Sequence, residues 1–154
     1  METTHLPRID FKDNFTVTNH IDSLSDIAKS IFGTGPKWIV QLLKLRNKIV
    51  GPLGLKTGEA PDLTKDLKVG STLGLFKVFQ ISDEQIIMGE DDNHLNFRVQ
   101  ISNKGTAENN IHVTTTVEIN NWLGKIYFTF IRPIHPIVVK SLLKNVDKPK
   151  VVSA

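Results

Sequence analysis

A strict alternation of apolar and polar residues between Ile111 and Ile119 is the feature that most limits how this chain can fold. Ile111, Val113, Val117 and Ile119 fall on one side of the pattern, with His112 and Glu118 among the residues on the other. A period of two is typical of a β-strand with one buried and one solvent-facing side. Residues 94–101 show the same alternation. The chain therefore predicts a β-sheet with one apolar face, which another layer must cover.

Further strands are predicted at residues 14–18, 73–79, 85–89 and 126–130. The last of these follows Ile119 after a tight turn, with Ile126, Phe128 and Phe130 as its apolar side. Short turns at 82–84 and 91–93 separate the middle strands. Strands joined by short turns pair antiparallel, so we expect a five-strand meander after the first strand.

Helices are predicted between the first two strands and at the carboxyl end. Asp22, Ser23 and Ser25 offer N-caps for a helix that ends near Gly33, because a short side-chain oxygen accepts an unpaired helix amide. A second short helix begins at Pro36 and ends before Gly51, and a loop covers 51–70. Pro133 suits the first turn of one long final helix. The predicted class is α+β, with helices gathered on one face of an antiparallel sheet.

Composition limits the class of protein further. The 154 residues suit one domain, 1–154, with flexible ends expected at 1–13 and 147–154. The chain has no cysteine, which excludes disulfides and thiolate chemistry. A net charge of +3, spread over single lysines, does not favour nucleic acid. No apolar run is long enough to span a membrane, and the first residues lack a secretion signal, so we expect a cytoplasmic protein.

Two segments carry a resemblance to known proteins. MGEDDNHLNFRVQI and TTTVEINNWLGKIYFTFIRPIHPIVVKSLL, and more loosely WIVQLLKLRNKIVGPLGL, resemble a bacterial family of domains of unknown function. The order of elements resembles the START-like (SRPBCC, helix-grip) superfamily, which includes polyketide cyclases and plant lipid-binding allergens. The resemblance implies a curved antiparallel sheet wrapped around a long C-terminal helix, with an apolar pocket between them. Some related chains carry the domain beside a Rossmann-type oxidoreductase domain, but this sequence has no G-x-G-x-x-G.

The implied pocket gives a set of candidate wall residues. They come from the predicted strands, the second helix and the final helix: Trp38, Leu42, Phe97, Val99, Thr115, Val117, Phe128, Phe130, Ile137, Val138 and Ser141. Thr115 and Ser141 put hydroxyls among apolar neighbours. A buried hydroxyl is costly unless it is paired, so each binds either a ligand or a nearby backbone carbonyl.

Five polar residues complete the candidates: Asp92, His94, Arg98, Arg132 and His135. Asp92 and His94 match no strong metal-ligand spacing, so we predict a turn there and neither a metal nor a cofactor. Arg98 lies on the face opposite Phe97, where an ion pair with Glu118 or Asp92 is expected at the solvent surface. Arg132, near a positive helix end, calls for a carboxylate partner.

Three functions remain open from the sequence. The first is non-catalytic binding of a hydrophobic small molecule, lipid or polyketide-like, in the pocket. The second is an enzyme of the cyclase or isomerase type, in which His135 and an acidic residue transfer protons. The third is an accessory domain that docks on an oxidoreductase. No serine or aspartate stands at a recognisable catalytic spacing, so no catalytic residue is assigned.

Overall fold

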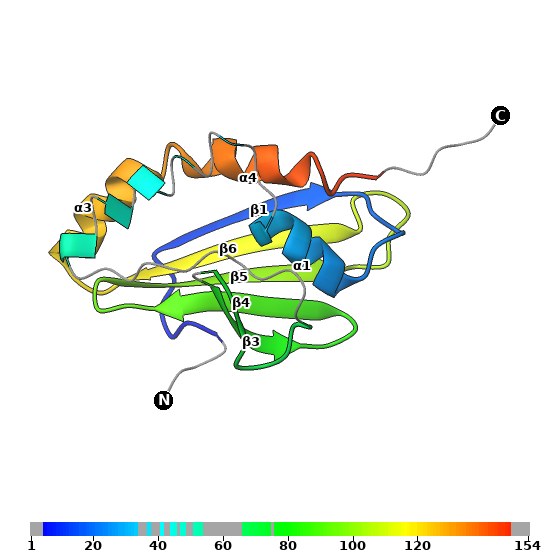
Figure 1. Cartoon of the computed structure of the whole chain (residues 1–154), viewed down its shortest axis with the longest axis horizontal. Helices are drawn as coiled ribbons and strands as arrows, with labels where there is room; N and C mark the ends of the chain where they lie inside the picture. The colour runs from blue at the N-terminus through cyan, green and yellow to red at the C-terminus, as the bar shows by residue number, and fades with distance from the viewer. Residues whose placement is uncertain are drawn as a thin grey trace.

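The computed structural model describes residues 5–33, 37, 41, 44–45, 47–48, 51–53, 66–74 and 76–148. Six strands form one antiparallel sheet in the order β1-β6-β5-β4-β3-β2 (Figure 1). Their bounds are β1 (Phe11–Val17), β2 (Thr72–Leu73), β3 (Phe76–Ile81), β4 (Gln85–Asp91), β5 (Leu95–Asn103) and β6 (Ile111–Ile119). The last five follow one another as a meander, and the first strand returns to pair with the last. The predicted α+β class, with a curved antiparallel sheet, is confirmed.

Alternation gives the sheet two distinct faces. The side that carries Phe15, Val17, Val99 and Ile101 is covered by helices, and we call it the helix face. The opposite side, with Lys12, Arg98 and Thr116, is the outer face. Strand register aligns the two sets across the sheet, since Val99 pairs with Thr115 and Arg98 with Thr116. Pairing in this register keeps every apolar side chain of β5 and β6 toward the helices, as the sequence pattern requires.

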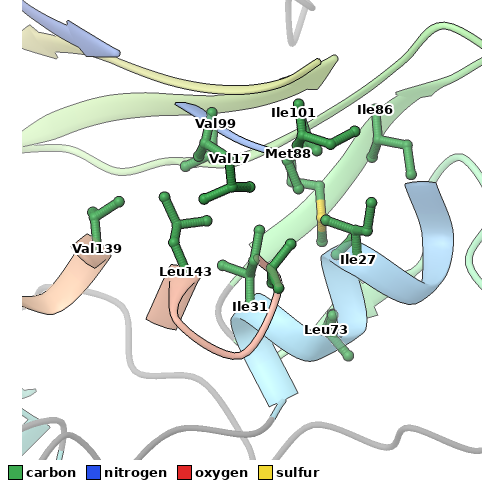
Figure 2. Close-up of a cluster of buried hydrophobic side chains, with 14 of the residues drawn as sticks. Val17, Ile27, Ile31, Leu73, Ile86, Met88, Val99, Ile101, Val139 and Leu143 are labelled. Carbon is green, nitrogen blue, oxygen red and sulfur yellow. The ribbon is translucent and has the colours of Figure 1, made fainter. Parts of the chain in front are cut away.

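The core lies between the helix face and two helices, α1 (Leu24–Gly33) and α4 (His135–Leu143). Figure 2 shows Ile27 and Ile31 of α1 and Val139 and Leu143 of α4 pointing at sheet residues. The sheet contributes Val17, Ile86, Met88, Val99 and Ile101, among others. Each such aliphatic side chain, fully buried, contributes about 1.5–3 kcal/mol of transfer free energy. The predicted cap is also present, since the Ser23 hydroxyl accepts a hydrogen bond from the Asp26 amide at 3.1 Å.

Two short helices replace the predicted strand 126–130 and the single long final helix. Residues 122–131 form helix α3 (Trp122–Ile131), which α4 follows at an angle of 54°. Asn121, expected in a hairpin turn, is the N-cap: its side chain accepts from the Gly124 amide at 3.0 Å. A strand at 126–130 is excluded because β1 already pairs with β6 along residues 11–17. Pro133 and Pro136 lack amide hydrogens, which accounts for the bend.

The predicted strand 73–79 is divided into β2 and β3, which pair antiparallel with each other. Other elements differ at their ends. β1 begins at Phe11 rather than residue 14. The second predicted helix is supported by the described residues of 37–48, all of which are helical. A short 3-10 helix, η1 (Gly51–Leu53), opens the predicted loop. Most of the rest of that loop lies outside the described residues. Helix α1 and the helical residues between 37 and 48 correspond to the two helices expected between the first two strands.

A buried asparagine joins three separate parts of the chain. Asn19 is 1% exposed, and its backbone amide donates to the Asn110 side chain at 2.9 Å. Its side-chain amide donates to Asp22 at 2.9 Å and to the Val146 carbonyl at 2.8 Å. Nearby, Lys148 donates from its backbone amide to the Thr18 carbonyl and from Nζ to Asp22. Residues 147–148 therefore contact the chain just after β1, and the Arg8 amide donates to Glu118 of β6.

This cluster predicts acid sensitivity. The Lys148 ammonium, and then the Asn19 amide, hold the pKa of Asp22 below its usual value. Because the folded pKa is the lower one, the ionised carboxylate stabilises the fold above pH 4, roughly its unfolded pKa, and this contribution disappears as pH falls through the folded pKa. We expect Asp22→Asn to cost about 1 kcal/mol at neutral pH and almost nothing near pH 2. Urea unfolding at both pH values measures this, and an equal loss at both contradicts it.

Within the described residues, no single helix is long and apolar enough to cross a bilayer. Helices α3 and α4 reach that length and apolarity only as a pair, and the bend of 54° separates them.

Candidate functional site

An aspartate interrupts the apolar side of the first strand. In β1, Phe11, Asp13, Phe15 and Val17 alternate with exposed Lys12, Asn14 and Thr16, so Asp13 points to the helix face. The side chain of Asp13 is 17% exposed, and both of its carboxylate oxygens are buried. A carboxylate in such a row is costly unless a cation or donor accompanies it.

Helix α4 supplies a ring nitrogen beside this carboxylate. His135 is its first residue, and Nε2 lies 3.0 Å from Asp13 Oδ2. That distance is typical of an ion pair, but the two groups are not aligned as donor and acceptor of a hydrogen bond. Within the described residues, His135 Nε2 and both Asp13 oxygens are buried and have no hydrogen-bond partner. Buried polar atoms are nearly always satisfied, so this pair has hydrogen-bonding capacity left for something else.

A third polar group lies beside the pair. Asp13 is directly opposite Thr115 in the β1–β6 register, which places their side chains together on the helix face. Thr115 is 7% exposed, and no hydrogen bond of its hydroxyl is found in the described part of the chain. Carboxylate, imidazole and hydroxyl therefore converge where the surrounding positions are apolar. We call Asp13, Thr115 and His135 the polar triad.

Aromatic rings close one side of the triad. The Phe11 ring lies 5.0 Å from that of Phe128 and 6.2 Å, edge-on, from His135. The guanidinium of Arg132 stands 5.4 Å from the same Phe11 ring. An open hollow of about 500 Å³ adjoins these residues, lined by Asp10, Ile119, Lys125, Phe128, Thr129, Arg132 and Pro133. The hollow lies between the end of β6, with Asp10 beside it, and the α3–α4 bend, and the predicted Phe128 and Arg132 both line it.

The structure keeps part of the predicted pocket wall together. Phe97, Val99, Thr115 and Val117 form adjacent cross-strand pairs on the helix face. Phe97 also packs edge-on against Phe76, with ring centres 5.5 Å apart. Val138 and Ser141 of α4 are half-buried. Trp38 and Leu42 lie outside the described residues.

Phe130 and Ile137 do not belong to that wall. Phe130 is 71% exposed and Ile137 is 59% exposed, so both point away from the sheet. For Phe130 the cause is the change of element: in a strand it would share a side with Phe128, whereas in helix α3 residues two positions apart are about 200° apart. Neither the hollow beside Phe128 nor the one beside Arg98 is the apolar pocket expected between the sheet and the final helix.

Arg98 is buried rather than solvent-facing, which corrects the sequence interpretation. Its side chain is 3% exposed, and its guanidinium pairs with Asp91 at 2.9 Å. Its guanidinium stacks on the Phe79 ring at 3.9 Å. Residues 5–9 cover this part of the outer face and enclose a hollow of about 140 Å³, whose wall includes Leu6, Ile9 and Arg98. An outer face hidden by a terminal segment cannot be recognised from alternation alone.

Asp92 and His94 serve the β4–β5 turn. The Asp92 amide donates to the Leu95 carbonyl at 3.1 Å, as expected for a turn. The His94 ring bonds the Asn121 side chain, with Nδ1 and Nδ2 2.9 Å apart. Among the residues that the structure describes, no three histidine, aspartate or glutamate side chains gather in a way that could hold a metal ion.

Asp13 is the site residue that the sequence interpretation missed. The prediction started the first strand at residue 14, which left Asp13 in a polar lead-in. The signal was the run Phe11, Asp13, Phe15, Val17, an apolar series with one acid in it. Extending the strand by three residues turns that acid inward and supplies the acidic partner that the enzyme hypothesis required for His135.

The fold and site define a small α+β domain with a buried polar group under its C-terminal helix. No curated protein and no solved structure matches the chain. A family model matches residues 5–142, and the chain belongs to that family, described as "Protein of unknown function (DUF2867)". The match includes β1, the sheet and most of α4, so all three members of the polar triad lie within it.

Proposed function

We propose that this domain binds a small, mostly apolar molecule through a single polar group that the triad recognises. The observation that carries the proposal is the unsatisfied pair: His135 Nε2 and the Asp13 oxygens are buried without a hydrogen-bond partner among the described residues. Ligand sites are typically apolar with a few convergent polar groups. A hydroxyl on the ligand donates to Asp13 and lies within hydrogen-bond reach of His135 Nε2, and the neighbouring rings hold its apolar body.

The START-like, helix-grip relationship belongs to the same proposal. A curved antiparallel sheet with α4 on its helix face supports it, as does the position of the polar group beneath that helix. The break at residues 132–134 departs from the single long helix of that layout. In this proposal the bend opens the hollow beside Phe128 and gives the ligand its way in.

Asp13→Asn tests the proposal, because asparagine keeps the shape of aspartate but removes its charge. We expect native mass spectrometry of the purified wild-type protein to show a co-purifying molecule, and the variant to lose it. A fluorescent fatty alcohol should bind the variant about ten- to hundredfold more weakly, since a hydrogen bond to a charged group contributes about 1.5–3 kcal/mol.

Two controls make the result specific to the triad. Asp83→Asn changes an exposed aspartate in the β3–β4 turn, far along the chain from the triad, so it should leave binding unchanged. The matching alkane probe, which has no hydroxyl, should not distinguish Asp13→Asn from wild type. Because removal of one member of a buried pair is destabilising, the double variant Asp13→Asn/His135→Gln serves as a second form without either charge. Equal binding of the alcohol by wild type and both folded variants contradicts the proposal.

Acid–base catalysis is the second candidate, and the 3.0 Å contact between His135 Nε2 and Asp13 Oδ2 favours it. A carboxylate beside an imidazole stabilises the imidazolium, which allows the histidine to accept and return a proton. Under this alternative, His135→Gln abolishes turnover of an identified ligand while the ligand remains bound. Under the binding function, the ligand is released unchanged by the wild-type protein.

A further inference from the structure

Helices α3 and α4 leave a row of large apolar side chains uncovered. Trp122 is 72% exposed, Phe130 71% and Ile137 59%, and Ile126 and Ile134 are also exposed. Trp122, Ile126, Phe130 and Ile134 are each four residues apart in the chain, and this spacing places them on one side of a helix. At the bend, Arg132 and Ile134 keep helical backbone angles, and Ile134 and Ile137 follow the exposed residues of α3 along α4. We call these five residues the apolar ridge.

Helix α3 contributes little to the core for a segment so rich in apolar residues. Its only fully buried residue is Gly124. The residues that surround Gly124, from Trp122 to Ile131, include two phenylalanines, a tyrosine and a leucine. Proteins rarely leave a continuous apolar patch of this kind exposed to water unless the patch binds something. We therefore expect a binding partner to cover the exposed side of α3.

The charge of this segment indicates which kind of partner covers it. Residues 119–146 contain four cations and no aspartate or glutamate: Lys125, Arg132, Lys140 and Lys144. The whole chain has a net charge of +3, so this segment, at +4, leaves −1 for everything else. All four cations are exposed. Two copies of the chain that met through this surface would bring eight cations together, which argues against a self-association interface.

We propose that the α3–α4 pair docks on the surface of an anionic phospholipid bilayer, with the apolar ridge inserted among the headgroups. A helix with aromatic and aliphatic residues on one side and lysine or arginine beside them is the type that lies in a membrane interface. The cations attract anionic headgroups, and Trp122 suits the boundary between water and hydrocarbon. The bend of 54° and the charged side chains fit a pair that lies on the bilayer rather than across it. This surface is separate from the polar triad.

Vesicle flotation tests the proposal with the full chain. Wild-type protein should float with phosphatidylcholine vesicles that contain about 30% phosphatidylglycerol and remain unbound with pure phosphatidylcholine. Each of Lys125→Gln, Lys140→Gln and Lys144→Gln should lower the partition coefficient about fivefold, which corresponds to the usual contribution of one basic residue near an anionic surface. The double variant Trp122→Ser/Phe130→Ser should lose binding altogether. Since these side chains are exposed, thermal unfolding should be unchanged.

Matched controls lie elsewhere on the surface. Ile21 is 75% exposed and Lys104 is exposed in the β5–β6 loop, so Ile21→Ser and Lys104→Gln should bind like wild type. About 1 M salt should release the bound protein, because salt screens headgroup attraction. Binding that survives this salt indicates an inserted span and overturns the interface proposal. Failure to bind anionic vesicles, or a wild-type dimer that Phe130→Ser dissociates, also overturns it, whatever the outcome of the Asp13 experiments.

Discussion

Replacing Asn19 with alanine should lower the free energy of unfolding by about 3 kcal/mol, the largest effect we expect from a single substitution. The Asn19 side chain donates to Asp22 and to the Val146 carbonyl, and its oxygen accepts from the amides of Ile21 and Asp22. Alanine leaves these groups without partners at a position that is 1% exposed. Each buried polar group left unpaired costs about 1–3 kcal/mol, and local rearrangement recovers part of the sum.

Urea unfolding followed by circular dichroism measures the loss, with Asn14→Ala as the control. Asn14 is also on β1 and bonds the Thr114 hydroxyl, at 2.8 Å, but it is exposed. Water replaces its partners, so we expect a loss of about 0.5 kcal/mol. A loss for Asn19→Ala as small as that of Asn14→Ala contradicts the importance of the buried cluster.

Gly124→Ala should cost about 2–3 kcal/mol or displace α3 from the sheet. A Cβ atom at position 124 would lie 2.0 Å from the His94 carbonyl oxygen, far inside any normal contact. The backbone on both sides is fixed. Asn121 caps α3 and donates to the Asn93 carbonyl at 3.1 Å, while the Asn120 amide donates to the same His94 carbonyl at 2.9 Å.

Thr129→Ala is the matched control, because Thr129 is exposed on the same helix and alanine favours helix formation. It should leave stability unchanged within about 0.5 kcal/mol. Hydrogen exchange of the α3 amides separates the two outcomes for Gly124→Ala: faster exchange confined to α3 indicates displacement, and faster exchange throughout indicates a lower global stability. Unchanged exchange and unchanged stability together contradict the close approach.

Most strands of the meander could be predicted because the alternation within a strand shows which of its sides is buried. In β5 and β6, alternation alone fixed which side chains face the helices. The segment 122–131 has no such alternation. It is apolar on nearly every side, and its hydrophobic period fits a strand as well as a helix. Only the pairing of β1 with β6, a contact between residues about a hundred positions apart, excludes a further strand there.

The candidate site could be predicted only in part for a related reason. The sequence identified His135 and Thr115 as candidates because they are polar groups in apolar surroundings, and the structure places both beside Asp13. Their convergence depends on register and on where α4 begins, which no local pattern specifies. The prediction for Arg98 was wrong for a different reason. Its strand and its side of the sheet were correct, but Phe79 and residues 5–9 cover that face, which alternation predicts to be exposed to solvent.

The parallel bridge between Asn19 and Lys148 has a consequence for synthesis. The turn after β1, made early on the ribosome, acquires its partners only when residues 146–148 have emerged. Native contacts of such wide sequence separation slow folding, because the chain must close a long loop before it gains any stabilisation. In the nascent protein, the turn at Asn19 is therefore expected to lack these partners until nearly all of the chain described here has been translated.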